Sequence, residues 1–240
     1  IIITNHQTAE MIKYAHNTFL ATKISFINQI ANICQGIPDT NIDDVANAMG
    51  LDPRIGNLFL NAGPGYGGSC LPKDIKAIIN LSSKLGVNPT LLTAVEKINK
   101  QQISHIVTLV KQNIGKINGK KLTILGVAFK PGTDDIRNSV SIDLVKRLLK
   151  LGAKITIHDP KALENARKIF HDNTKYVKSV PSALKDCQCA IIMTQWKDYE
   201  KINNKTIKQM AKKFIIDTRR VLYNKNLDAK YYAIGLGQKI

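Results

Sequence analysis

The segment from Gly63 to Asp74, Gly-Pro-Gly-Tyr-Gly-Gly-Ser-Cys-Leu-Pro-Lys-Asp, carries the residues best suited to chemistry. Four glycines in its first six positions allow positive φ angles and let a ligand approach the backbone closely. Pro72 is typical of the first turn of a helix, which puts Cys70 at a helix start. There the helix dipole and nearby Lys73 favour the thiolate, the nucleophilic form of cysteine. The pattern predicts either a catalytic cysteine or, on the plainer interpretation, a flexible turn beside a structural thiol.

A second pair of polar side chains comes earlier in the chain. Lys13 and Asn17 are four residues apart, so they share one face if this segment is helical. The alternative is a solvated lysine and a surface asparagine, but the many apolar neighbours leave this helix little polar face. An amine beside an amide can stabilise a developing alkoxide or oxyanion.

Helical periodicity predicts the elements that position these residues. Apolar side chains recur at helical spacing over residues 8–34, and Gly36 and Pro38 end that segment. Further helices are predicted over 41–49, 72–85 and 88–114. The last of these would span about 39 Å, so we expect it to link two domains or to form a subunit interface.

The pattern changes after Gly119, where short β-branched runs begin to alternate with helical segments. This alternation predicts an α/β fold with a doubly wound parallel sheet after the helical part. Strands are predicted over 122–129, 154–158, 176–177, 190–193 and 214–217, and helices near 139–151, 181–186 and 204–212. Ligands bind past the carboxyl ends of such strands. Those ends are marked by Phe129-Lys130-Pro131, His158-Asp159-Pro160, Thr194-Gln195-Trp196 and Asp217-Thr218-Arg219.

The composition excludes several classes of protein. The chain has 240 residues, and 35 basic against 18 acidic side chains give a formal net charge of +17. Such a charge attracts anions, but scattered lysines with abundant Asn and Ile are typical of a general codon drift. No zinc-finger or aromatic RNA-binding signature is present, so we expect no nucleic-acid partner. No run approaches about 18 apolar residues, so we expect no membrane span.

The cysteines and the start of the chain bear on metals and location. Cys34, Cys70, Cys187 and Cys189 match no zinc-ligand spacing, so no metal site is predicted. No signal peptide is recognisable at the start. We therefore expect a cytoplasmic protein.

Three motifs together resemble one known family. They are Ala9-Glu-Met-Ile-Lys-Tyr-Ala-His-Asn17, Gly67-Gly-Ser-Cys-Leu-Pro-Lys-Asp74 and Gly126-Val-Ala-Phe-Lys-Pro-Gly-Thr-Asp-Asp-Ile-Arg137. In this order and spacing, the chain resembles the UDP-glucose/GDP-mannose dehydrogenase family over essentially its whole length. The resemblance implies a central helical dimerisation domain over 1–87, a connecting helix over 88–117 and a Rossmann-like, UDP-sugar-binding α/β domain over 118–240.

The resemblance also implies a reaction and roles for particular residues. The implied reaction is the NAD-dependent oxidation of UDP-glucose to UDP-glucuronate, in which Cys70 captures the intermediate aldehyde as a thiohemiacetal. A second hydride transfer would then give a thioester that water hydrolyses. Lys13 and Asn17 would stabilise the oxyanion, and Asp74 would assist the water or the proton transfers.

The implied binding residues surround that centre. The substrate would be bound by Phe59, Asn61, Gly63, Tyr66, Gly67, Leu71, Phe129, Lys130 and Arg219. Arg54 would reach a substrate in the neighbouring subunit of a homodimer. Lys73 and Arg137 would lie near NAD.

The departures from the family pattern leave alternatives open. Family members begin with a G-x-G-x-x-G turn for NAD, which does not open this chain, and Gly235-Leu-Gly-Gln238 lacks the strand-to-helix context. We expect an excised fragment, or the product of a split or decayed gene that works with a separate NAD-binding domain. Leu71 stands where an aromatic residue is frequent, and Thr218-Arg219-Arg220 where Gly-Arg-Asn is common. A GDP-mannose or UDP-amino-sugar dehydrogenase, or a non-catalytic nucleotide-sugar-binding or dimerisation fragment, is the alternative.

Overall fold

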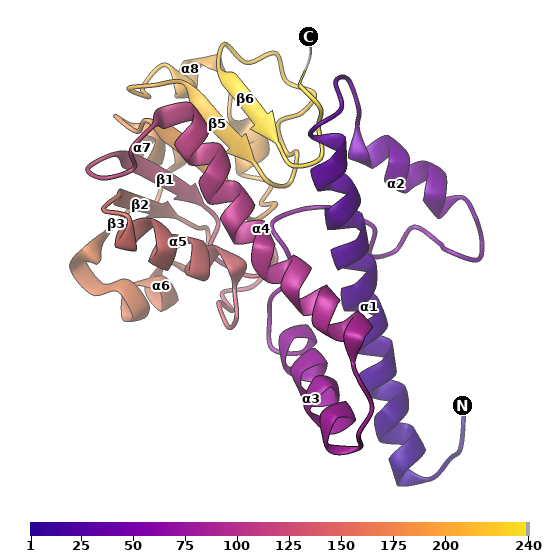
Figure 1. The fold of residues 1–240 in the computed structure, drawn as a ribbon. Helices are drawn as coiled ribbons and strands as arrows, with labels where there is room; N and C mark the ends of the chain where they lie inside the picture. The colour runs from indigo at the N-terminus through magenta and orange to yellow at the C-terminus, as the bar shows by residue number, and fades with distance from the viewer. Residues whose placement is uncertain (239–240) are drawn as a thin grey trace.

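Four helices form the first half of the chain. The computed structural model describes residues 1–238 and places α1 at His6–Cys34, α2 at Ile42–Gly50, α3 at Leu71–Lys84 and α4 at Thr90–Ile114. Asn5 begins α1, since its side chain accepts a hydrogen bond from the Thr8 amide, and Asn41 caps α2 in the same way through the Asp43 amide. The predicted helices are confirmed to within a few residues. Figure 1 shows α4 running from beside α1 and α3 to the sheet.

A six-stranded sheet, parallel throughout, forms the second half. Its strands are β1 (Lys121–Leu125), β2 (Lys154–His158), β3 (Thr174–Tyr176), β4 (Cys189–Ile192), β5 (Phe214–Asp217) and β6 (Lys230–Ala233). They lie in the order β3-β2-β1-β4-β5-β6, so the direction of winding reverses between β1 and β4. This is a doubly wound α/β fold, as the alternating pattern predicts.

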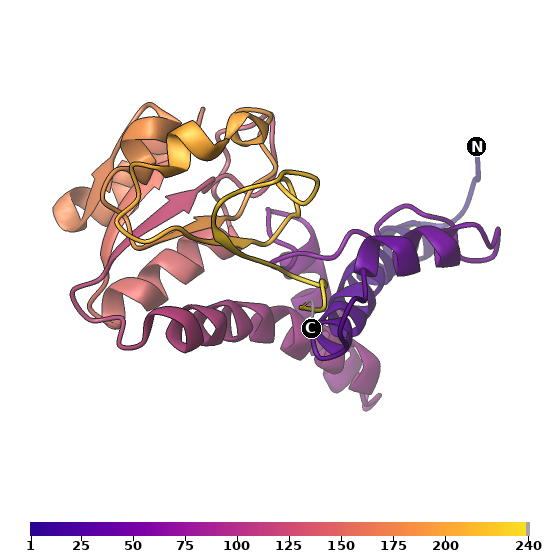
Figure 2. The same ribbon diagram turned by 90° about the horizontal axis from the view of Figure 1, so that it is seen from above.

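Helices cover both faces of the sheet. The connections are α5 (Val140–Lys150), α6 (Leu163–Phe170), η1 (His171–Asn173), α7 (Val180–Leu184), η2 (Tyr199–Lys201) and α8 (Asn204–Ile207). Figure 2 shows α4 and α5 below the sheet and α7 and α8 above it. In the part of the chain that the structure describes, no helix combines the length and the apolar character needed to cross a membrane.

Two predicted bounds in the sheet half are wrong, and one strand is missing from the prediction. The first strand ends at Leu125 rather than at 129, because Gly126 has φ +94° and turns the chain away from the sheet. The helix expected over 204–212 ends at Ile207, where the chain bends so that the Ala211 amide bonds to the Cys187 carbonyl. Strand β6 was not predicted, since its Lys-Tyr-Tyr-Ala sequence follows a polar segment and carries no alternating pattern.

One continuous apolar core joins the two halves. It contains the sheet interior and also includes Ile27 and Ala31 of α1, Ile42 of α2, and Ile106 of α4. The segment after β6 completes the junction, because Gly235 accepts a hydrogen bond from the Ile42 amide at 2.9 Å. A side chain at Gly235 would collide with Ile42, so glycine is required there for this close approach.

Candidate active site

The carboxylate of Asp74 is the centre of a charged group at the start of α3. It is fully buried, and its Oδ2 accepts hydrogen bonds from Asn17 Nδ2 at 2.5 Å and from Lys13 Nζ at 3.2 Å. Lys73 Nζ lies 3.1 Å from the other oxygen, Oδ1. The structure therefore brings Lys13 and Asn17 of α1 to the first turn of α3, where the sequence predicts chemistry.

The electrostatics of this group keep the carboxylate ionised. Burial raises the pKa of Asp74, but the hydrogen bonds from Asn17, Lys73 and Lys13 lower it more, so the pKa lies below its usual value. The same contacts with Asp74 raise the pKa of Lys73, to which the Cys70 thiol adds a smaller contribution. An ionised Asp74 can orient two neighbouring donors without taking their protons.

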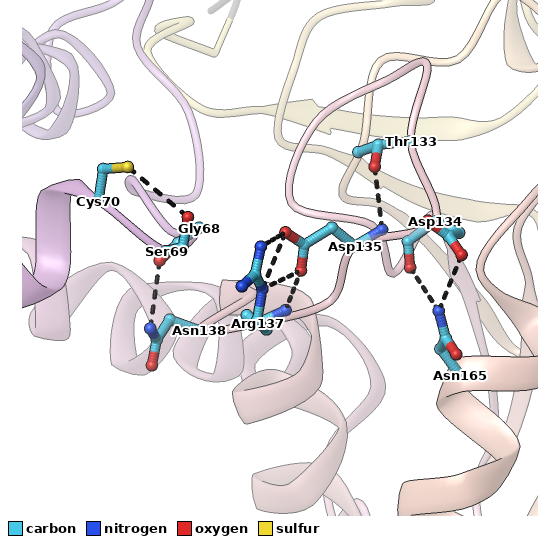
Figure 3. A network of polar contacts seen from close by, with 9 residues as sticks. All are labelled: Gly68, Ser69, Cys70, Thr133, Asp134, Asp135, Arg137, Asn138 and Asn165. Atoms are coloured by element: carbon cyan, nitrogen blue, oxygen red, sulfur yellow. Dashed lines mark hydrogen bonds and ion pairs between the residues drawn. The ribbon is translucent and has the colours of Figure 1, made fainter.

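Cys70 lies one helical turn before Asp74 and is exposed. It is the residue that precedes α3, and the Asp74 amide bonds to its carbonyl at 2.9 Å. Its Sγ is 3.6 Å from the hydroxyl oxygen of Ser69 (Figure 3). An accessible thiol at the N-terminus of a 14-residue helix, next to lysine, is placed as a nucleophilic cysteine requires.

The Gly-rich segment is held from two helices. The Gly63 amide donates to Asn28 Oδ1 of α1 at 2.7 Å. Asn99 of α4 bonds to both backbone groups of Tyr66, accepting from its amide at 2.8 Å and donating to its carbonyl at 3.0 Å. Burial raises the pKa of the Tyr66 phenol well above its usual value, so that ring is a packed neutral group. The segment is therefore an anchored loop rather than a flexible turn.

The end of the Gly-rich segment lies against the loop after β1. The Gly68 amide donates to the Arg137 carbonyl at 3.1 Å, and Asn138 Nδ2 donates to the Gly68 carbonyl at 3.2 Å. Figure 3 shows this contact, with Cys70 at its far end. A Cβ at Gly67 would lie 2.4 Å from the Asn138 carbonyl oxygen, so only glycine permits this approach.

Residues from two strand ends meet the start of the same segment. A Cβ at Gly63 would lie 2.7 Å from a terminal nitrogen of Arg219, and a Cβ at Gly68 would lie 2.9 Å from the Phe129 ring. Lys130 lies over the Phe129 ring, with its Nζ 5.4 Å from the ring centre. A narrow crevice separates the segment from the sheet, and it is lined by Pro64, Gly65, Gly67, Ala128, Phe129, Ser139, Val140, Ser141, Met193 and Arg219.

Arg219 makes this crevice positively charged. Burial, and then the neighbouring charge of Arg220, lower the pKa of Arg219 to about 10 despite the opposing effect of Asp217. Its Nε donates to the Met193 carbonyl at 3.4 Å, whereas its terminal nitrogens face Gly63. A guanidinium with terminal donors directed at a glycine backbone suits an anionic ligand such as a phosphate.

Two models of one protein family match the chain. Residues 7–101 match the central domain of the UDP-glucose/GDP-mannose dehydrogenase family, and residues 123–224 match its UDP binding domain. The chain belongs to the UDP-glucose/GDP-mannose dehydrogenase family.

Individual members of this family are similar over nearly the whole chain. The UDP-glucose 6-dehydrogenase of Rickettsia felis is 42% identical over 98% of the chain, and one from Bacillus subtilis is 39% identical over the same share. The structure of a UDP-glucose dehydrogenase from Pyrobaculum islandicum superposes with a TM-score of 0.91 at 34% identity and covers 98% of the chain. In each comparison the chain spans about half the length of its relative, at 53%, 52% and 52%.

Some residues implied by the family resemblance lie outside the Asp74 group. Arg54 is exposed and pairs with Asp52 at 2.6 Å, and Asn61 is exposed between α2 and the Gly-rich segment. Phe59 is 40% exposed and adopts φ +67°, which is uncommon for a bulky residue. Leu71 is partly exposed as the first residue of α3. The roles of these four residues remain predictions.

The two residues expected near NAD, Lys73 and Arg137, each pair with a neighbouring carboxylate. Lys73 pairs with Asp74. Arg137 donates from Nε and a terminal nitrogen to the carboxylate of Asp135, at distances of 2.7–3.1 Å (Figure 3). The first turn of the sheet, where a pyrophosphate would meet free amides, is occupied instead by the carboxylate of Asp159. The described residues thus do not fit NAD at this turn.

Several residues that shape the site belong to none of the three sequence motifs. They hold backbone groups of the two loops from a distance in sequence, and they are Asn28, Asn99, Asn138, Ser139, Thr194 and Arg220. Asn28 offers one signal, since a polar residue between Ile27 and Ile30 in an apolar helix needs a buried partner.

Proposed function

We propose that this chain is the substrate-binding and nucleophile-bearing part of an NAD-dependent UDP-glucose 6-dehydrogenase. The observation that carries the proposal is the contact of Asp74 with Lys13 and Asn17, one helical turn from the exposed Cys70. This arrangement combines a nucleophile with two donors for a negatively charged oxygen. The four cysteines are all free thiols, which supports a reducing compartment, and we place the reaction in the cytoplasm.

The proposed chemistry uses the hydrogen atoms of Asn17 and Lys13 that are not bound to Asp74. When the Cys70 thiolate adds to the aldehyde carbon at C6 of the sugar, a C–S bond forms and the aldehyde oxygen becomes negative. Asn17 Nδ2 and Lys13 Nζ each use one hydrogen for Asp74 and keep others for that oxygen. NAD, when bound, accepts the hydrides of the two oxidations. Asp74 is fully buried and keeps both donors in place, so we propose that it assists the hydrolytic water through these donors.

The proposed substrate site lies along the rim of the crevice between the Gly-rich segment and the sheet, because the crevice itself has a volume of only about 10 Å³. The guanidinium of Arg219 and the exposed amine of Lys130 supply positive charge for a diphosphate at this rim. Gly67 lines one side of the crevice, and Phe129 lies on the other. In the proposal, Gly63 and Tyr66 contact the substrate from the same side as Gly67. In the proposed assignment, Leu71, Asn61 and Phe59 continue this side toward the sugar.

We infer that NAD is held by a partner domain outside the 240 residues. The chain spans about half the length of its relatives, and Asp159 fills the turn where a pyrophosphate would bind. In this proposal Lys73 and Arg137 face the partner domain from the rim of the site.

Calorimetric titration with UDP-glucose tests the proposed function directly. We expect weak binding by the whole chain, lost in Arg219→Gln and retained in the control Arg167→Gln, whose side chain stacks on Tyr176. We also expect no absorbance from NADH when UDP-glucose and NAD are both added. Turnover by the chain alone would contradict the partner-domain proposal, and absence of UDP-glucose binding would contradict the assigned function.

Related nucleotide sugars form the second candidate. The structure of a UDP-D-ManNAc dehydrogenase from Pyrococcus horikoshii superposes with a TM-score of 0.85 at 25% identity, which favours an amino sugar over GDP-mannose as the alternative. Competition of UDP-N-acetylmannosamine and GDP-mannose against UDP-glucose distinguishes the three. Binding without any turnover, even with an added NAD-binding domain, would indicate a non-catalytic module.

We further infer a homodimer formed through the helical half. Four large apolar side chains, Ile12, Phe19, Phe26 and Ile33, follow one another at intervals of seven residues along α1, and all are 44–64% exposed. Seven-residue spacing keeps side chains on one face of a helix. In the dimer, Arg54 extends toward the substrate of the neighbouring subunit.

A further inference from the structure

The carboxylate of Asp159 accepts five hydrogen bonds although it is only 2% exposed. Its Oδ1 accepts the amides of Lys161 and Ala162, which forms the turn into α6. Its Oδ2 accepts the amides of Val127 and Ala128, at 2.7 and 3.0 Å, together with Trp196 Nε1 at 3.2 Å. Oδ1 thus binds the residues that follow its own strand. Oδ2 binds the loop after β1 and the Trp196 side chain.

The loop after β1 is fixed at two consecutive residues. The Val127 carbonyl accepts the hydroxyl of Ser139 at 2.7 Å, and the Ala128 carbonyl accepts the hydroxyl of Thr194 at 2.7 Å. Together with Asp159, these side chains bind all four backbone polar groups of the pair. Residues after β2, after β4 and before α5 therefore together determine the direction in which the chain leaves residue 128.

The next residue is Phe129, which lies against the Gly-rich segment. A Cβ at Gly68 would be 2.9 Å from the Phe129 ring, so the ring and the glycine backbone are in close contact. Lys130 follows immediately and lies over the same ring. Asp159 fixes the backbone of residues 127 and 128, and this backbone in turn sets the positions of Phe129 and Lys130 beside the crevice.

The place of Asp159 in the sheet makes this role specific. In dinucleotide-binding sheets the amides of the first βα turn receive a pyrophosphate, and an acidic residue after the second strand binds a ribose. Here the acidic residue after β2 turns inward and satisfies those amides itself. The fixed negative charge replaces a bound phosphate as the partner of the turn.

We propose that Asp159 is a positioning residue that shapes the loop over 127–130 before substrate binds, and so presents Phe129 and Lys130 to a UDP-sugar. The proposal rests on the proposed function, because it assumes that the UDP-sugar lies at the rim of the crevice, beside Phe129 and Lys130. An unshaped loop would have to be ordered at each binding event, which weakens affinity.

The variant Asp159→Asn tests the proposal in the whole chain. The amide keeps the shape of the side chain but turns one oxygen into a donor that faces N–H groups. We expect the dissociation constant for UDP-glucose to rise about tenfold or more. We also expect faster hydrogen exchange at residues 126–129, with unchanged exchange in α1 and α4. Trp196 is the single tryptophan, so a red shift of its emission reports loss of the contact with Asp159.

Two further variants complete the test. Asp198→Asn, which alters an exposed carboxylate that lies 3.9 Å from Lys201 and forms no hydrogen bond or ion pair with the described loop over 127–130, should leave affinity, exchange and emission unchanged. Thr194→Val leaves Asp159 intact and frees the Ala128 carbonyl, so it should weaken binding by a smaller factor, and it decides the matter if Asp159→Asn does not fold.

The possible outcomes separate this proposal from the proposed function. Faster exchange at 126–129 with wild-type affinity would overturn the positioning role, as would unchanged exchange there. A uniform increase of exchange along the whole chain would make Asp159 a general stability residue and would also overturn it. If the wild-type chain bound no UDP-glucose, the proposed function would fail, whereas the exchange of residues 126–129 would still show whether Asp159 holds the loop.

Discussion

Arg220 and Asp43 form an ion pair across the junction between the helical half and the sheet, with Nε 2.7 Å from Oδ2. The other nitrogens of Arg220 donate to the carbonyls of Ala62 and Ile234, at 3.1 and 3.0 Å. The Arg220 side chain is 6% exposed, so these bonds are largely shielded from water. One side chain therefore joins α2, the start of the Gly-rich segment and the residue after β6.

Replacement of Arg220 by Met should destabilise the protein. The variant removes three hydrogen bonds and leaves two carbonyls and a half-exposed carboxylate without their partner, so we expect a loss of about 2 kcal/mol in the free energy of unfolding. Urea unfolding measures the change. The matched control is Arg54→Met, which removes an exposed pair and should have no measurable effect. Equal effects of the two variants would contradict the role of Arg220 at the junction.

Cys70 should react with iodoacetamide at least about tenfold faster than the other three cysteines. It is exposed, whereas Cys34, Cys187 and Cys189 are buried. Burial also raises the pKa of Cys187 to about 11 and raises the pKa of Cys189 well above its usual value, which disfavours their thiolates. Peptide mapping by mass spectrometry after limited labelling gives the ratio.

Labelling in denaturant provides the control for this measurement, because all four thiols should then react alike. Equal labelling of the four cysteines in the folded chain would remove the physical basis for Cys70 as the nucleophile.

His158 should make the folded state less stable in mild acid. Burial lowers the pKa of its imidazole below the usual 6.5, and the opposing charges of Asp159 and Asp198 are too weak to restore it. The unfolded chain therefore binds a proton more readily than the folded one. This contribution to stability is complete above about pH 6.5 and is lost as the pH falls from there through the folded-state pKa.

Comparison of unfolding at about pH 7.5 and about pH 5.5 measures this effect. His158→Gln should reduce the loss of stability between the two pH values, and His16→Gln, at an exposed position of α1, should leave it unchanged. The same acid dependence in all three proteins would show that His158 is not the group responsible.

Local patterns predict the elements better than the contacts between them. The periodicity of α1 and the apolar run of β1 depend on neighbouring residues, so the sequence reveals both, whereas β6 is stabilised by pairing with β5 and shows little pattern of its own. The end of β1 depends on Gly126, whose positive φ cannot be distinguished in sequence from the ordinary freedom of a glycine.

Site residues can likewise be predicted where a local pattern marks them, but not where a contact between distant residues places them. Lys13 and Asn17 could be recognised because they share a helix face, although nothing in their spacing points to Asp74, more than fifty residues away. Asp159 and Trp196 were expected at the ligand-binding edge of the sheet, but their mutual hydrogen bond depends on the order in which β2 and β4 flank β1. The strand order follows from the fold as a whole, which no local pattern contains.

The exposed apolar side chains of α1 lead to a prediction about assembly. Figure 1 shows α3 and α4 on one side of α1, and α2 on its other side near the C-terminal end of α1. The buried residues of α1 include Ala21, Ile27 and Ala31, so the stripe that contains Phe19 and Phe26 lies on a different face and is not used within the chain. Pairing two such stripes would remove four phenylalanine rings from water in one interface.

Phe19→Asp should convert the expected dimer into a monomer. Each dimer would bury two charged carboxylates in place of two rings, so we expect its dissociation constant to rise roughly 100-fold or more. Light scattering at micromolar concentration measures the mass of both proteins. Leu85→Asp is the matched control, since Leu85 is 69% exposed at the end of α3 and lies outside the stripe, and it should leave the dimer intact. A monomeric wild-type chain, or a dimer that survives Phe19→Asp, would contradict pairing through α1.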